Sequence, residues 1–147
     1  MNWKLIFLGG LAMYIVMFAV SLATGLVIHE QILEPLYIQN SEFWRPELNV
    51  DPPDMAALMP RWISMGLLTS FVFAGIFGVV RSAFAGPGWQ RGLKFGVILA
   101  LMNCCFAIGY SGIFNLPDSI WAWWSVESFF YFLPAAAVLG WLGDKFD

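Results

Sequence analysis

One acidic residue lies deep inside an apolar stretch near the C-terminus. Glu127 is about seven residues into residues 120–142, roughly 10 Å from the start of that stretch if it is helical. A carboxylate in apolar surroundings is costly, and it usually faces the interior of a helical bundle or a cavity. A proton relay, a cation site or an ion pair with a partner chain would use it. The structural alternatives are a pair with Arg61 or a side chain that reaches back to the membrane interface.

A second polar side chain interrupts the preceding apolar stretch. Asn103 lies near the centre of residues 93–114, where an asparagine usually bonds across helices or to a free backbone carbonyl. Binding a ligand is the alternative role. The adjacent Cys104 and Cys105 cannot form a disulfide framework, so we expect them to be packing residues with inert thiols.

Three potential metal ligands, His29, Glu30 and Glu34, end the first apolar stretch. Their spacing matches no zinc pattern, so we interpret them as a solvated helix end and expect no metal. His29 is the only histidine, which excludes haem ligation by two histidines of this chain. Motifs for phosphate binding and for hydrolysis are absent as well, so the sequence predicts no catalytic residue and no cofactor.

The composition predicts a helical membrane protein. Of the 147 residues, 60% are hydrophobic and 12% charged, and the mean hydropathy is +0.73; soluble domains carry about 25% charged residues. Roughly 20 apolar residues in a helix cross a bilayer core about 30 Å thick. Four stretches qualify, at residues 5–28, 57–80, 93–114 and 120–142. Because four strands could not close a barrel in lipid, the expected fold is all-α, a single transmembrane four-helix bundle over residues 1–147.

The distribution of charge orients these helices. Lys and Arg favour one side of the expected membrane, so the positive-inside rule predicts that both termini are cytoplasmic. The acidic loop of residues 29–56 is then extracytoplasmic, and the first helix is a retained span and not a cleaved signal. Without a basic run, the chain is not expected to bind nucleic acid. The cytoplasmic basic residues are Lys4, Arg81, Arg91, Lys94 and Lys145; those on the other side are Arg45 and Arg61.

Small residues recur at every fourth position in two of the stretches. Such stripes let membrane helices approach closely. Because a short loop joins the second and third helices, we expect their stripes to face each other; contact with another subunit is the alternative. The second helix carries Gly66, Ser70, Ala74 and Gly78, and the third carries Gly92, Gly96 and Ala100.

Aromatic and capping residues support the helix boundaries. Trp121, Trp123 and Trp124 open the fourth stretch, where indole rings typically anchor a helix at the membrane interface. Stacking of these rings on a ligand is the alternative. Asp54 precedes the second helix and is a good N-cap.

One segment carries a resemblance to known proteins. Arg91-Gly-Leu-Lys-Phe-Gly96 enters the third stretch, and Pro117 and Trp121 flank the turn into the fourth. Over roughly the last 60 residues this arrangement resembles small four-helix bacterial membrane proteins of unknown function. The resemblance implies the same topology, in the bacterial inner membrane, and no particular activity.

Two functions remain after these exclusions. The first is an accessory or structural subunit that docks on other membrane protein subunits, or on itself. The alternative is a small oligomeric transporter or channel that uses Glu127 and Asn103. An enzyme is disfavoured because no nucleophile–base pair is visible. A carboxylate at Glu127 that lines a pocket favours the transporter, and one that faces lipid or a partner favours the subunit.

Overall fold

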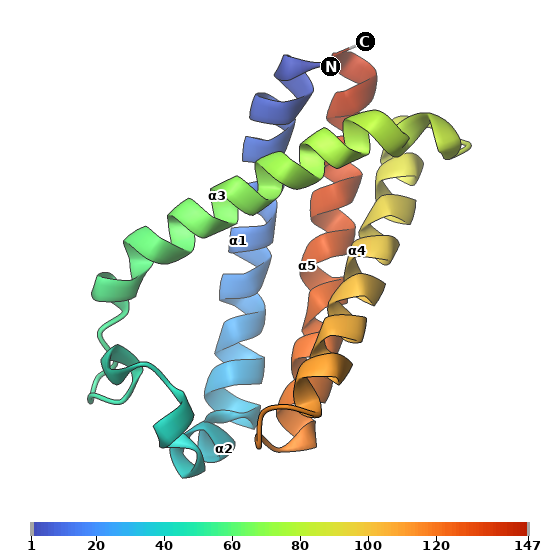
Figure 1. Cartoon of the computed structure of the whole chain (residues 1–147). Helices are drawn as coiled ribbons and strands as arrows, with labels where there is room; N and C mark the ends of the chain where they lie inside the picture. Colours follow the sequence, from blue (N-terminus) through green and yellow to red (C-terminus); the bar gives the residue numbers. More distant parts are fainter. Residues whose placement is uncertain (1, 147) are drawn as a thin grey trace.

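The computed structural model describes residues 2–146, so Met1 and Asp147, the ends of the expected domain, lie outside the described residues. Within that range every regular element is a helix, which confirms the all-α prediction. Four of the helices are long and apolar enough to cross a membrane. Three of them run roughly side by side, and the remaining one, α3, crosses the others at an angle (Figure 1).

The long helices extend beyond the apolar stretches at several ends. The first runs without a break over Leu5–Ile32, with π-helical turns (η1, Leu5–Gly9, and η2, Ile28–Ile32) on either side of α1, Gly10–Val27. The third begins at Gly88, before the expected residue 93. The expected start followed the apolar residues, whereas the polar residues Gln90 and Arg91 also belong to the helix. The other elements are α2 (Glu34–Gln39), η3 (Ser41–Phe43), η4 (Pro46–Leu48), α3 (Met55–Val80), η5 (Arg81–Ala83), α4 (Gly88–Ser111) and α5 (Asp118–Lys145).

α4 and α5 pack with their backbones in contact. A Cβ atom added at Gly92 would lie 2.0 Å from the carbonyl oxygen of Ala136, and one added at Gly140 would lie 2.1 Å from that of Gly88. At Gly96 the nearest atom would be another carbonyl oxygen of α5, at 2.8 Å. Glycine is needed where two helices approach this closely. The stripe predicted on the third helix therefore faces the fourth.

The stripe of α3 faces α1, so the expected contact between the stripes of the second and third helices is wrong. A Cβ atom at Gly66 would lie 2.6 Å from the ring of Tyr14, and the hydroxyl of Ser70 lies 3.9 Å from the sulfur of Met17. The glycine face of α4 already packs against α5. On the other side, the missing side chain of Gly10 allows α1 to approach the backbone of Ser70 on α3. Both stripes thus make contacts within the chain. Ala74 is fully buried and Gly78 lies close to Leu5.

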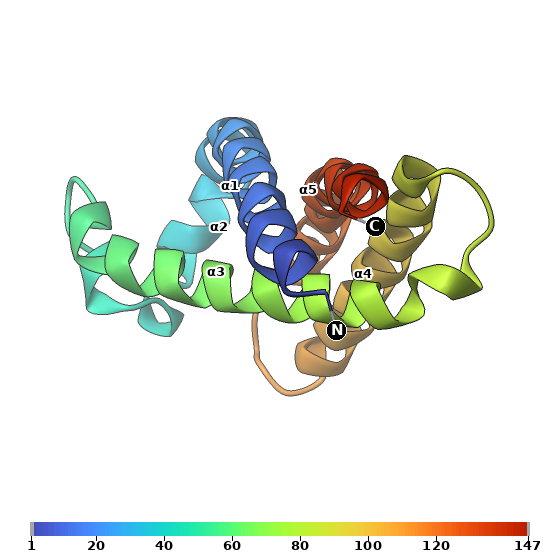
Figure 2. The ribbon, with the colours of Figure 1, turned by 90° about the horizontal axis from the view of Figure 1, so that it is seen from above.

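Both described ends of the chain lie at the same end of the bundle (Figures 1 and 2). The side-chain amide of Asn2 donates to the carbonyl of Phe146 at 2.8 Å. Close by, Arg91 at the start of α4 forms an ion pair with Asp144 near the end of α5. Polar contacts thus hold this end together.

The long loop, residues 33–54, lies at the opposite end and leads into α3. The carboxylate of Asp54 accepts a hydrogen bond of 3.1 Å from the N–H of Ala57, which confirms the predicted N-cap. This bond satisfies one of the N–H groups that the first turn of a helix leaves free.

Replacing Gly92 with alanine should destabilise the protein, because the new methyl group would overlap the backbone of Ala136. We expect Gly92→Ala to lower the free energy of unfolding by about 1–3 kcal/mol or more. Gly75→Ala is the matched control, since nothing lies within 4 Å of a Cβ atom there. Thermal unfolding in detergent measures both, and equal stability of the two variants would contradict the close contact.

Candidate functional site

The carboxylate of Glu127 faces the interior of the bundle. Its residue is only 6% exposed, on α5, and two residues of the first helix reach it. The hydroxyl of Thr24 lies 2.5 Å from Oε1, and Nε2 of His29 lies 3.0 Å from Oε2. Both carboxylate oxygens are therefore held by one helix.

Arg61, the expected partner, lies elsewhere. It is exposed on the N-terminal half of α3, and α3 diverges from α5 in that direction (Figures 1 and 2). The predicted pair of Glu127 and Arg61 is therefore wrong. Because α3 crosses α1 at an angle, the N-terminal half of α3, which contains Arg61, lies away from α5. The side chain beside the carboxylate of Glu127 is His29 instead.

The other ring nitrogen of His29 continues the network into the long loop. Its Nδ1 lies 2.6 Å from the hydroxyl of Tyr37 on α2, and this hydroxyl accepts a hydrogen bond of 2.8 Å from the indole N–H of Trp124. The indole N–H of Trp44 donates to the backbone carbonyl of Tyr37, also at 2.8 Å. The network joins the first helix, the long loop and α5.

A π-helical turn presents His29 to this network. The turn Ile28–Ile32 closes with a bond of 2.8 Å from the N–H of Leu33 to the carbonyl of Ile28, five residues back. Such turns are rare and are frequent at functional positions. The chain bends at Leu33 and enters α2, which brings Tyr37 back over His29.

The hydroxyl of Tyr37 bridges His29 and Trp124. Burial raises the pKa of Tyr37 to about 12, and the charge of Glu127 adds to this, while the bond from Trp124 opposes it. Tyr37 therefore keeps its proton at neutral pH. Because an indole only donates, the hydroxyl oxygen of Tyr37 accepts the bond from Trp124 and also lies within hydrogen-bond distance of Nδ1 of His29.

Two groups of the first helix orient the carboxylate of Glu127. The hydroxyl of Thr24 donates to it, and Nε2 of His29 lies within hydrogen-bond and ion-pair distance of it. A carboxylate has lone pairs for about four hydrogen bonds, so two such donors leave it able to accept more. An ionised Glu127 would carry one net negative charge, in a region where charges are strongly disfavoured unless paired.

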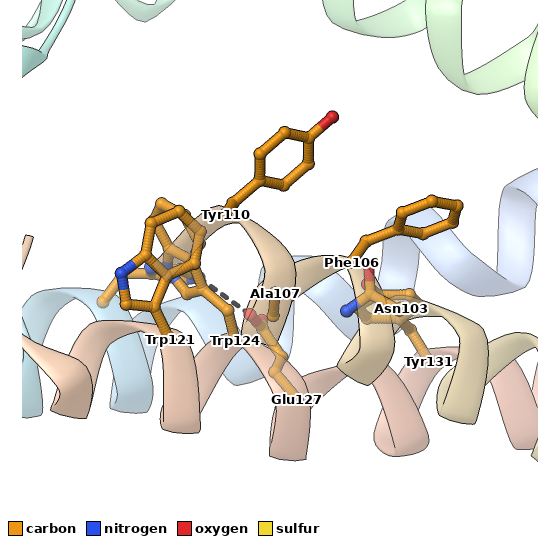
Figure 3. Close-up of a pocket in the computed structure, with 9 residues that line it drawn as sticks. Asn103, Phe106, Ala107, Tyr110, Trp121, Trp124, Glu127 and Tyr131 are labelled. Atoms are coloured by element: carbon orange, nitrogen blue, oxygen red, sulfur yellow. Dashed lines mark hydrogen bonds and ion pairs between the residues drawn. The ribbon is translucent and has the colours of Figure 1, made fainter. Parts of the chain in front are cut away.

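A cavity of about 360 Å³ lies beside this carboxylate. The volume falls within the usual range for small-molecule sites, about 300–1,000 Å³. Side chains of α4 and α5 form most of the wall, and His29 adds a ring nitrogen from the first helix (Figure 3). Besides His29 and Glu127, the lining residues are Asn103, Phe106, Ala107, Tyr110, Trp121, Trp124 and Tyr131.

No family model, curated protein or solved structure matches this chain. The chemistry of the cavity must therefore be inferred from its own residues.

The three potential metal ligands named from the sequence do not point to one place. His29 is engaged with Glu127, whereas Glu30 and Glu34 are exposed. Over residues 2–146, no three His, Cys, Asp or Glu side chains come together as a metal site.

Two of the predicted site residues, Glu127 and Asn103, line the same cavity (Figure 3). Sequence reasoning missed Thr24 and Tyr37 as partners of Glu127 and His29. The available signal was that the single histidine lies at the end of a span, where a second polar group from another span could meet it. Nothing in the hydropathy pattern marks the fold of the long loop that supplies Tyr37.

Tyr37 should ionise at about pH 12 and not near its ordinary value of 10.0, because burial disfavours the phenolate. Its raised pKa means that the neutral hydroxyl contributes stability below about pH 10, and that this stability is lost as the pH rises toward 12. The tyrosinate absorbance of the wild type minus that of Tyr37→Phe measures the midpoint. A difference titration centred near pH 10 would contradict the buried network.

Proposed function

We propose that the chain is a multi-pass protein of the bacterial inner membrane with both termini in the cytoplasm. Four long apolar helices support the multi-pass architecture. The orientation is supported by the basic residues. Lys4 and Lys145 lie near the two ends of the chain, Arg81 donates to the carbonyl of Gly143, and Arg91 pairs with Asp144 near the end of α5. Lys94 follows one turn later in α4. The positive-inside rule assigns such an end to the cytoplasm.

This orientation predicts which exposed positions an impermeant maleimide reaches in spheroplasts. In a background with Cys104 and Cys105 replaced by serine, Glu42→Cys in the long loop should react at once. Ser82→Cys, between α3 and α4, should react only after the membrane is permeabilised. The reverse pattern would overturn the orientation.

We further propose that the protein works as a small transporter whose ligand site is the cavity beside Glu127. The observation that carries this proposal is a buried carboxylate that lines a cavity and is held by two donors from another span. Intramembrane acids that face a cavity typically mark substrate or ion pathways. A carboxylate kept only for packing would need no such space beside it.

The geometry suggests how a ligand would be held. The donors from Thr24 and His29 fix the orientation of the carboxylate before a ligand arrives, which reduces the ordering cost of binding. The amide of Asn103 offers both a donor and an acceptor on the α4 side of the cavity. Because His29 is about one-third exposed, the site is approached from the end that carries the long loop.

Glu127→Gln should abolish ligand binding and transport, because it removes the charge while keeping the shape of the side chain. A panel of small cations, anions and neutral solutes, screened by thermal shift in detergent, should yield compounds that stabilise the wild type but not this variant. The same compounds should evoke transient currents from wild-type proteoliposomes on a solid-supported membrane.

Glu42→Gln is the control, since it removes one exposed acid of the long loop outside the cavity. Stabilising compounds that act equally on Glu127→Gln, or a panel without any stabilising compound, would overturn the transporter proposal.

An accessory subunit of a membrane complex is the second candidate. One observation favours it: only 17% of the most apolar window of α3 is buried within the chain, the smallest share among the four long helices. A larger assembly would cover such a helix. Recovery of a stoichiometric partner in mild detergent, together with an inert Glu127→Gln variant, would support this candidate over the transporter.

A further inference from the structure

We propose that His29 and Glu127 together form a proton-binding site, and that the proton is the ion to which transport is coupled. This inference rests on the transporter proposal and names the coupling ion of the same site. The observation that carries it is the bridge through Tyr37, because this arrangement keeps its hydrogen bonds with or without a further proton on the ring.

Both ring nitrogens of His29 have a partner in either protonation state. In the one-proton form, Nε2–H donates to Glu127 across 3.0 Å, and Nδ1 accepts from the hydroxyl of Tyr37 across 2.6 Å. In the two-proton form, Nδ1–H donates to the same hydroxyl oxygen. A hydroxyl has two acceptor lone pairs, so this oxygen accepts from His29 and from the indole of Trp124 together. Uptake of a proton at Nδ1 therefore requires only a rotation of the Tyr37 O–H bond.

The charge of the pair explains why a proton would bind and also leave. With Glu127 ionised, the pair carries one net negative charge when the ring has one proton and none when it has two. Charges inside a membrane bundle are disfavoured unless they are paired, and at 3.0 Å the two-proton ring has its counter-charge in direct contact. Partial removal of the charged ring from water opposes this gain. Because the two effects have opposite signs, uptake is reversible.

The other groups around the pair add no competing charge. Among residues 2–146, Glu127 is the only buried acidic residue. Glu30, beside His29 in the first helix, is exposed, and so is Arg61 on α3. The remaining titratable groups that face the pair or its neighbours are phenols and a thiol, which are ordinarily uncharged at neutral pH. They are Tyr37 of α2, Tyr110 and Cys104 of α4, and Tyr131 of α5.

The ring lies between water and the carboxylate. The side chain of His29 is 36% exposed and that of Glu127 is 8% exposed, so a proton from the side of the long loop meets the ring first. Both side chains also line the cavity, where the carboxylate faces residues of α4 (Figure 3). A ligand in the cavity therefore changes the surroundings of the ring. By reciprocity, ligand binding and proton binding must then affect each other, which is what proton coupling requires.

Because His29 is the only histidine, its ring can be observed without assignment. In the full chain labelled with ¹⁵N-histidine and embedded in lipid bilayers, solid-state NMR distinguishes the one-proton ring from the two-proton ring. We expect the ring to convert reversibly between these forms as the pH is changed. A ring that keeps one form at every pH at which the protein is folded would overturn the proposal.

Glu127→Gln tests the part played by the carboxylate, because it removes the counter-charge and keeps the shape of the side chain. At the pH at which half of the wild-type rings carry two protons, at most about a tenth of the rings of this variant should do so. Tyr37→Phe removes the acceptor of Nδ1–H and should also lower the fraction. Glu42→Gln, in the long loop, is the control and should leave it at half. Equal fractions in the wild type and Glu127→Gln would contradict the site.

Proton binding by the wild type can also be measured without any other ligand. A rapid acid step applied to proteoliposomes on a solid-supported membrane should evoke a transient current, because the proton moves part of the way into the membrane to reach the pair. His29→Asn should lose this current and Glu42→Gln should keep it. A wild-type current no larger than that of protein-free liposomes would reject the site.

The outcomes separate this inference from the transporter proposal. Compounds that bind through Glu127, to a protein whose ring never changes its proton count, would retain the transporter and reject the proton. Reversible proton binding without any Glu127-dependent compound would retain the proton-binding site and reject transport, and the coupling with it.

Discussion

The close contact between α4 and α5 is the interaction on which the rest of this structure depends. Glycine at positions 88, 92 and 96 lets α4 lie against the backbone of α5, so the two helices behave as one rigid unit at the end that carries the termini. Further toward the long loop, α4 carries larger side chains, among them Asn103, Phe106 and Tyr110. The cavity lies where this contact ends.

A charged group inside a membrane bundle imposes a second constraint. Lipid offers no hydrogen bonds, so the partners of Glu127 must come from the chain itself. Thr24 and His29 meet this need, and they also tie the first helix to α5 at the level of the cavity. The same hydrogen bonds thus have a structural effect and a chemical one. They fix the orientation of the carboxylate beside the cavity.

Much of the fold follows from hydropathy and little of the site does. Four apolar stretches predict four helices, because in lipid the backbone N–H and C=O groups of each stretch must bond to one another, and a helix achieves this within a single segment. The small-residue stripes predict close contacts, but their periodicity does not say which helix lies opposite; Gly92 meets Ala136, and Gly66 meets Tyr14. Glu127 and Asn103 stand out because polar residues in apolar stretches require a reason. Tyr37 does not stand out, since its role depends on a bend at Leu33 that no local pattern encodes.

The hydrogen bonds of Tyr37 have a consequence for communication across the protein. Through its carbonyl Tyr37 holds Trp44 of the long loop, and through its hydroxyl it holds both His29 and Trp124. An event at the loop that displaces Tyr37 would remove the hydroxyl bonded to Nδ1 of His29, and with it one support of the geometry at the carboxylate. By thermodynamic reciprocity, whatever occupies the carboxylate must then bias the conformation of the loop to the same extent. A single phenol thus links the long loop to the buried carboxylate by a continuous chain of hydrogen bonds.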